Sequence, residues 1–83
     1  MTEERRLGTI LLLIESKESI SKMNVIITKF SHLIIGRQGI SLRERDLNII
    51  SLVLEGNSDE IGAFSGQLGR LDGIKVKAAI MKS

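Results

Sequence analysis

Apolar positions in this 83-residue chain are densest in Leu47–Glu55, a run of aliphatic and β-branched residues that predicts a strand. Gly56-Asn57 ends the run with two residues typical of turns. A strand with apolar side chains on both faces belongs in the centre of a sheet that is covered on both sides. Here one face holds Ile50, Leu52 and Leu54, and the other holds Leu47, Ile49 and Val53.

Three further segments are predicted to be strands. Arg5–Ile14 is also apolar on both faces, so we expect it to be the second central strand. Leu33–Ser41 contains Gly36 and Gly39, either of which could mark a β-bulge or a close approach of two backbones. The last strand begins at Ile74, where apolar residues alternate with Lys and small residues. On the first strand, Ile10, Leu12 and Ile14 share one face, and Leu7, Leu11 and Leu13 share the other.

Two segments between the strands have the three- and four-residue spacing of amphipathic helices. The first, Ser19–Ser31, follows Ser16, whose hydroxyl can cap a helix start. The second follows Asn57 and Glu60, which have the spacing of a capping box. The apolar stripes are Ile20, Met23, Ile26, Ile27 and Phe30 in the first helix and Ile61, Phe64, Leu68 and Leu71 in the second.

The second helix also contains three glycines, Gly62, Gly66 and Gly69. Each glycine lowers helix stability by roughly 1 kcal/mol relative to Ala. We therefore expect this face of the helix to pack closely against another element, either the sheet or a neighbouring subunit.

The order strand-helix-strand-strand-helix-strand is that of the ferredoxin-like fold. We predict a single α+β domain over residues 1–83, with a four-stranded antiparallel sheet and two helices on one face. The first and third strands are central in that topology, in agreement with the two segments that are apolar on both faces. The helices cover one face only, so we expect a second copy to cover the other face and to form a homo-oligomer. The predicted interface residues are Leu7, Leu11, Leu13, Ile49 and Val53.

Composition restricts the function classes. Twelve basic and ten acidic residues give a net charge of +2, too small by itself to indicate a nucleic-acid-binding surface. The absence of Cys excludes disulfides, thiolate metal sites and cysteine nucleophiles. The longest apolar run, Ile10–Ile14, is far shorter than the roughly 20 residues of a membrane span, and no secretory signal pattern is seen. We expect a soluble, cytoplasmic protein that does not interact with membranes.

No constellation of residues typical of catalysis is found, so we expect no enzymatic activity, no metal and no cofactor. The single histidine, His32, is expected beside the free carbonyl groups at the end of the first helix. Arg37, Arg43 and Arg45 lie around the predicted hairpin and could bind an anionic ligand. Acidic residues alternate with the last two, which favours a solvated turn that neutralises itself.

Several short runs resemble a known family. They are Ile34–Ile40 (Ile-Ile-Gly-Arg-Gln-Gly-Ile), Asn48–Ile50, Asp59–Ala63 and Gly66–Lys77. The arrangement is similar to that of the small iron-only hydrogenase system regulators, which are stand-alone ACT-like domains similar to the C-terminal domain of nickel-responsive regulators. The resemblance covers nearly the whole chain. It implies an ACT-like βαββαβ fold and a regulatory, ligand-sensing role as a dimer or tetramer.

Effectors of ACT domains generally lie near the first strand-helix loop, here Glu15–Glu18. The resemblance therefore implies Glu15 and Ser16 as candidate ligand-binding residues, to which we add Arg37 and Gly39 of the second strand. The loop lacks the glycine often seen in members that bind amino acids, so a different small-molecule effector, or none, is left open.

The alternative function is a regulator that binds nucleic acid directly. Ferredoxin-like sheets can bind RNA through exposed aromatic side chains. The two aromatic residues, Phe30 and Phe64, do not lie on predicted strands. Nucleic acid is therefore the less favoured partner, and a mobility-shift assay at low salt separates the two classes.

Overall fold

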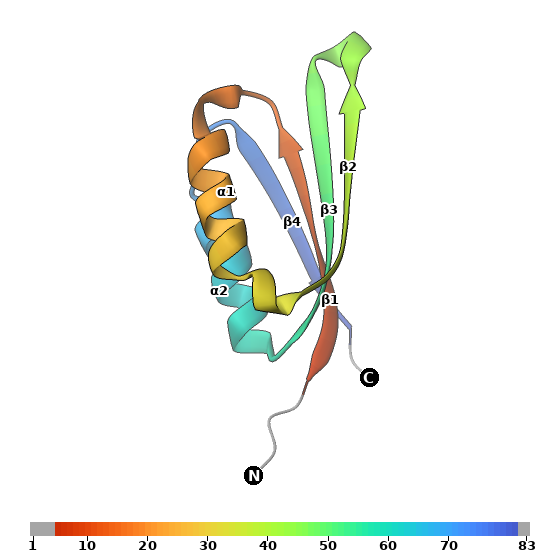
Figure 1. Ribbon diagram of the computed structural model, residues 1–83, viewed down its shortest axis with the longest axis vertical. Helices are drawn as coiled ribbons and strands as arrows, with labels where there is room; N and C mark the ends of the chain where they lie inside the picture. Colours follow the sequence, from red (N-terminus) through yellow and green to blue (C-terminus); the bar gives the residue numbers. More distant parts are fainter. Residues whose placement is uncertain (1–4, 82–83) are drawn as a thin grey trace.

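The computed structural model describes residues 5–81, which form a four-stranded antiparallel sheet with two helices on one face (Figure 1). The strand order in the sheet is β2-β3-β1-β4. The fold is therefore ferredoxin-like α+β, as predicted. The strands are β1 (Arg6–Ile14), β2 (Ile34–Leu42), β3 (Leu47–Gly56) and β4 (Ile74–Ile80), and the helices are α1 (Ile20–Lys29) and α2 (Ser58–Gly69).

The two strands predicted to be central, β1 and β3, are neighbours in the middle of the sheet. Ile10 pairs with Leu52 and Leu12 pairs with Ile50 across this antiparallel pair. Directly opposed residues point to the same face of a sheet, so these four side chains line one surface. That surface faces the helices.

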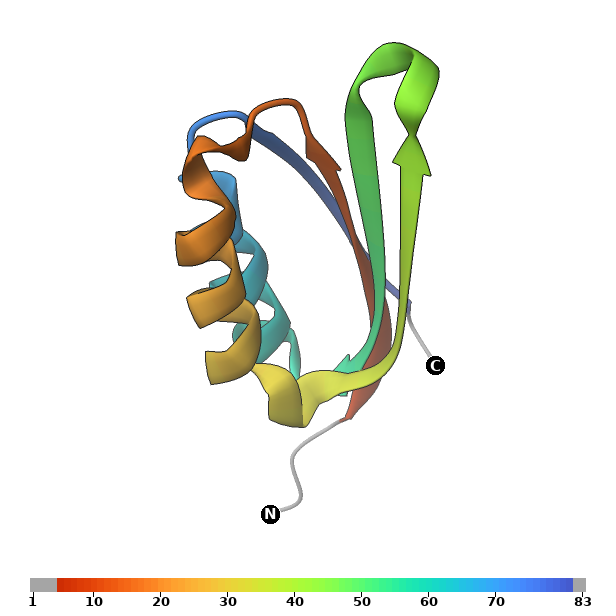
Figure 2. The same ribbon diagram turned by 45° about the horizontal axis from the view of Figure 1, so that its top comes forward.

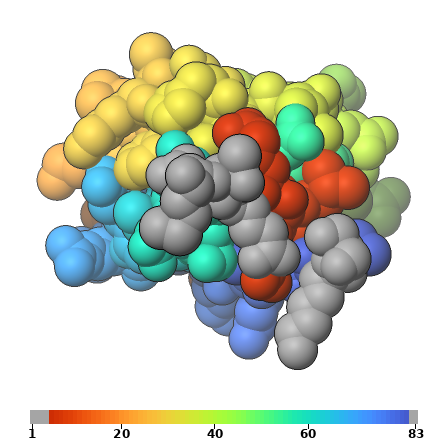
Figure 3. Space-filling model, turned by 90° about the horizontal axis from the view of Figure 1, so that it is seen from below, coloured from red at the N-terminus to blue at the C-terminus, as the bar shows by residue number. Residues whose placement is uncertain are grey.

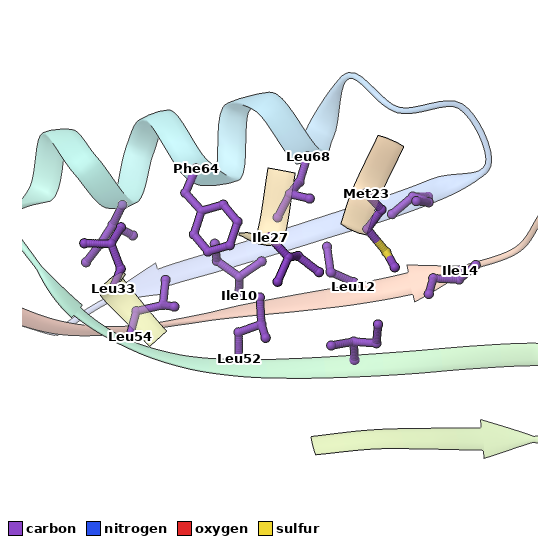
Figure 4. Close-up of a cluster of buried hydrophobic side chains, with 13 residues drawn as sticks. Ile10, Leu12, Ile14, Met23, Ile27, Leu33, Leu52, Leu54, Phe64 and Leu68 are labelled. Atoms are coloured by element: carbon purple, nitrogen blue, oxygen red, sulfur yellow. The ribbon is translucent and has the colours of Figure 1, made fainter. Parts of the chain in front are cut away.

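The hydrophobic core lies between this surface and the two helices (Figure 4). Phe64 of α2 is fully buried, and its ring stacks on that of Phe30 with centroids 4.8 Å apart. Burying an aliphatic or aromatic side chain of this size contributes about 1.5–3 kcal/mol. The other fully buried side chains are Ile10, Leu12, Leu33, Leu52, Leu54, Ile61 and Leu68.

The predicted cap of α2 forms, whereas the one predicted for α1 caps a short turn before the helix instead. The Asn57 side chain accepts a hydrogen bond from Glu60 N–H at 2.8 Å, and the Glu60 carboxylate accepts one from Asn57 N–H at 3.1 Å. This is the predicted capping box of α2. Ser16 accepts a bond from Glu18 N–H and caps a 3₁₀ turn at Lys17–Ser19, so α1 itself begins only after that turn, at Ile20.

The predicted bulge in β2 lies at the first of the two candidate glycines. Ile34 pairs with Leu54 and Gly36 with Val53, so Ile35 is the extra residue. Gly39 pairs with Ile50 inside the regular part of the ladder. The bulge changes which side chains face the helices. Beyond the bulge, Arg37 pairs with Leu52 and Gly39 with Ile50, so both lie on the face of the sheet that the helices cover.

Of the two partners predicted for the glycines of α2, the sheet is wrong, and a neighbouring subunit stays a prediction. Gly62, Gly66 and Gly69 are all exposed. A Cβ atom added at any of these three positions would meet no other atom within 4 Å. The side of the helix that faces the sheet carries the buried stripe of Ile61, Phe64 and Leu68, and the glycines lie away from it.

The β2–β3 hairpin extends beyond the layer of helices (Figures 1 and 2). Its connection is a 3₁₀ turn at Arg43–Arg45 that ends at Asp46, which adopts a left-handed conformation with φ of 52°. Asp tolerates this conformation better than most residues with a side chain. The inner face of the distal hairpin is therefore covered only partly, by the start of α1.

Candidate functional site

The outer face of the sheet, away from the helices, carries large aliphatic side chains that the chain does not cover. Leu7, Leu11 and Val53 are 48%, 46% and 44% exposed. Leu13 and Ile49 oppose each other across β1 and β3 and are half-buried. All five residues predicted for the oligomer interface therefore lie on one face.

Strand β2 extends this face in a way the sequence reasoning missed. Ile40 opposes Ile49 and is 44% exposed, and Leu42 opposes Leu47. The signal was present as alternation in β2, but the bulge had to be located before its two faces could be assigned. We call Leu7, Leu11, Leu13, Ile40, Ile49 and Val53 the outer apolar patch.

Polar residues border the outer apolar patch on the β4 side. Lys77 opposes Leu11, and Lys75 opposes Leu13. The Lys75 ammonium lies 3.6 Å from the Glu15 carboxylate, and both side chains are well exposed. Thr9, Ser51 and Gln38 share this face, so its centre is mainly but not wholly apolar. With the charged border on the β4 side, it resembles a protein–protein interface, in which an apolar core has a polar rim.

A polar cavity lies between the β1–α1 loop and the hairpin. Its volume is about 280 Å³, and Glu15 and Ser16 line it together with Asp46 and Asn48. The loop is fixed because the N–H groups of Glu15 and Ser16 both donate to the carbonyl of Gly73, at 2.8 and 3.2 Å. Lys17 lines the cavity as well, so its polar wall combines two carboxylates, an ammonium, a hydroxyl and an amide.

A more apolar cavity adjoins it and shares Ile14 and Asn48 with it. Its volume is about 250 Å³, and it lies between the start of α1 and the inner face of the hairpin. Gly39 lines it with Ile20 and Met23. Three of the four candidate ligand-binding residues therefore line adjoining cavities, whereas Arg37 lines neither and lies two residues from Gly39 on the same face of β2.

The remaining charged candidates lie elsewhere. His32 contacts Glu60, with Nε2 and Oε2 3.6 Å apart, so its described partner is a carboxylate rather than the helix-end carbonyls we had expected. Arg43 and Arg45 are exposed at the hairpin turn, about one strand length from this histidine. Within residues 5–81 no group of three or more His, Asp or Glu is arranged to hold a metal ion. No helix in this range is long and apolar enough to cross a membrane.

Comparison with known proteins gives one family. The model of the TM1266-like family, described as "Iron-only hydrogenase system regulator, putative", matches residues 6–78. No match was found among curated proteins.

Two solved structures are similar to this chain. The uncharacterized protein TM1266 from Thermotoga maritima superposes with a TM-score of 0.88 at 34% sequence identity, over 95% of this chain and 100% of that one. The de novo designed protein Foldit4 superposes with a TM-score of 0.59 at 10% identity, over 96% of this chain and 99% of the design. The second likeness concerns the fold alone.

Proposed function

Because the chain belongs to the TM1266-like family, we propose that it is a non-enzymatic regulatory module of an iron-only hydrogenase system. In this proposal it acts as a homo-oligomer joined through the outer apolar patch. The observation that carries the proposal is the half-exposed row of Leu7, Leu11 and Val53 on the central strands. Soluble monomers rarely leave contiguous apolar patches larger than a few hundred Å² uncovered.

A second copy is the natural partner for such a patch. Under a two-fold axis the same patch lies on both subunits, so apolar side chains meet apolar side chains without a second specialised surface. An 83-residue domain has a small core of its own, and burial of this face adds to it. Both points favour assembly of identical chains.

A regulatory module also needs an input, and we propose the two adjoining cavities as the effector site. Glu15, Ser16, Asp46 and Asn48 offer hydrogen bonds to a polar group, and Ile20 and Met23 offer apolar contact. Such a combination is usual for small-molecule sites. The class of effector is identified by a thermal-shift screen of amino acids, nucleotides and metal salts. Glu15→Ala and Asn48→Ala should abolish the shift that any hit produces.

The assembly is tested with Leu11→Lys combined with Val53→Lys, measured by sedimentation equilibrium. Two ammonium groups on the outer apolar patch would lie in the proposed interface without partners, so we expect the double variant to be monomeric where the wild type is not. The control is Val25→Lys with Thr28→Lys, which adds the same charge on the exposed side of α1. A wild type that is monomeric at micromolar concentration would contradict the proposal.

Two further measurements separate this function from other classes. No turnover is expected, since neither cavity is lined by histidine and the chain has no Cys. Hydrolase or transferase activity that disappears on Arg37→Ala would contradict this. A mobility shift with DNA or RNA that survives physiological salt would favour the nucleic-acid-binding alternative.

A further inference from the structure

The sheet has two edges, and they differ. Figure 3 shows the chain from α1 to the start of β2, in orange and yellow, along one side of the molecule, and α2 and β4, in cyan and blue, along the opposite side. The β4 edge carries Lys75 and Lys77, and lysine on an edge strand disfavours the addition of a further strand. The β2 edge carries one charged side chain, Arg37, and is exposed from Arg37 to Ser41. Both edges are exposed, but the β2 edge has fewer charged side chains that disfavour the addition of a strand.

Arg37 is the charged side chain in the exposed part of the β2 edge. No Asp or Glu occurs between Ser19 and Arg43, and Leu47–Leu54 of the adjacent strand contains no charged residue at all. The other basic groups near this edge have acidic neighbours: His32 lies 3.6 Å from the Glu60 carboxylate, and Glu44 follows Arg43 in the turn. Strand β2 contains no acidic residue and Leu52 is the residue opposite Arg37 in β3, so an acidic side chain placed beside Arg37 would gain a charged partner.

The bulge at Ile35 gives this edge a specific shape. Beyond it, Arg37 opposes Leu52 and Gly39 opposes Ile50, so both point to the face that the helices cover. Gly39 lines the cavity of about 250 Å³ that Ile20 and Met23 also line. A Cβ at Gly39 would meet nothing within 4 Å, so space lies beside the strand at this residue. A guanidinium and an apolar cavity thus lie two residues apart on one face of an open edge.

We propose that the β2 edge binds an extended acidic segment of another protein, which adds to the sheet as a fifth, antiparallel strand. Main-chain hydrogen bonds would provide affinity, and alternate side chains would provide specificity. In the antiparallel register, the residue opposite Gly39 is aliphatic and enters the cavity. The residue two positions later is Asp or Glu and lies opposite Arg37. The recognised pattern is therefore an aliphatic residue, any residue, then an acidic residue.

A second copy of the chain fits this edge less well. Pairing β2 with itself about Gln38 would put Arg37 opposite the partner's Gly39, so the two Arg37 side chains would be diagonal neighbours on the same face. Moving the centre to Ile40 would place Arg37 opposite Arg43. Neither register places an acidic side chain opposite Arg37. The proposal concerns the hydrogen-bonding edge of β2, a different surface from the outer face of the sheet that carries the outer apolar patch.

The test uses synthetic peptides and the full chain. Thr-Thr-Val-Thr-Glu-Thr-Thr carries the proposed pattern, and the control peptide has Lys in place of Glu. Binding is followed by the amide chemical shifts of the protein. We expect the Glu peptide to shift the amides of β2 but not those of β4, and to bind about tenfold or more tightly than the Lys peptide.

Charge exchange provides the matched variants. Arg37→Glu should reverse the preference, so that the Lys peptide binds more tightly than the Glu peptide. Gly39→Val should weaken binding of the Glu peptide, because the new side chain occupies the space that the valine of the peptide needs. The fold should stay intact, because no atom lies within 4 Å of a Cβ at this position. Lys77→Glu, on the opposite edge, should change neither result. Circular dichroism of each variant confirms folding.

Three results would overturn the proposal. The first is equal binding of the two peptides, or no shift of the β2 amides at millimolar peptide. The second is an unchanged preference in a folded Arg37→Glu protein. The third is protection of the β2 amides from hydrogen exchange that rises with protein concentration without peptide, because a second copy would then cover this edge.

Discussion

At the scale of single residues, Gly73 occupies a position that no other amino acid fits well. Its φ is 79°, and an added Cβ would lie 2.6 Å from the Cβ of Ser16. Its carbonyl also accepts the two hydrogen bonds that fix the β1–α1 loop. The geometry of the polar cavity thus depends on a residue that does not line it.

We expect Gly73→Ala to lower the free energy of unfolding by about 1–3 kcal/mol, because it combines backbone strain with a steric clash. Chemical denaturation measures the change. Gly73→Ala combined with Ser16→Gly removes the atoms that clash and should recover part of the loss. A single variant as stable as the wild type would show that the loop can shift away without cost.

Gly66 is the opposite case, a glycine that the folded subunit does not require. It lies inside α2, it is exposed, and the space around its missing side chain is empty. Gly66→Ala should therefore raise the free energy of unfolding by roughly 0.5–1 kcal/mol, since alanine restricts the unfolded chain and favours the helix. A loss of stability that accompanies dissociation of the oligomer would instead show that α2 contacts a neighbouring subunit.

At the scale of elements, the start of α2 is defined by its capping box. Without the Asn57 side chain, the partly buried N–H of Glu60 in the first turn would lose its acceptor. We expect Asn57→Ala to destabilise the protein by about 1 kcal/mol. The control is Ser58→Ala, one residue further and exposed, which should change stability by a few tenths at most. Thermal unfolding followed by circular dichroism compares the two, and equal effects would argue against a role for the cap.

The elements themselves were readable from the sequence, since apolar spacing and caps are local signals. Strands β1, β3 and β4 and the apolar stripes of both helices follow from alternation and from the three- and four-residue period. The capping box follows from two residues three apart. Even the outward position of Gly66 was available, because a helix that buries Phe64 and Leu68 turns residue 66 away from the core.

The site was less predictable because it depends on choices that are not local. Gly36 and Gly39 are chemically identical, and only pairing with β3 shows that the irregularity lies next to Gly36. That choice decides whether Ile40 or Arg37 faces outward. The cavities likewise depend on Asp46 and Asn48, which the fold brings beside Glu15 from more than thirty residues away. Sequence patterns at this length carry no signal for such a contact.

At the scale of the whole molecule, the outer apolar patch predicts that stability depends on concentration. If only assembled subunits bury this patch, mass action raises the melting temperature as the protein concentration rises. We expect such a rise for the wild type and none for Leu11→Lys with Val53→Lys. Differential scanning fluorimetry over a hundredfold range of concentration measures it. Identical concentration dependence in both proteins would place the interface elsewhere.

The projecting hairpin has a further consequence, for the timescale on which different parts of the sheet open. Leu52 and Leu54 are sealed beneath the helices, whereas Ser41 and Asn48 lie on the distal part, where Ser41 Oγ–H donates to Asn48 Oδ1 near the tip. Opening the distal ladder exposes little buried apolar surface, so it needs far less free energy than global unfolding. The part of the sheet under the helices should therefore stay closed while the distal part of the β2–β3 hairpin opens locally. Amide hydrogen exchange should be slow at residues 52 and 54 and progressively faster toward the turn. A ligand bound in the cavities between the distal hairpin and the start of α1 would be enclosed when the hairpin closes. Its residence time would then depend on how often the distal hairpin opens.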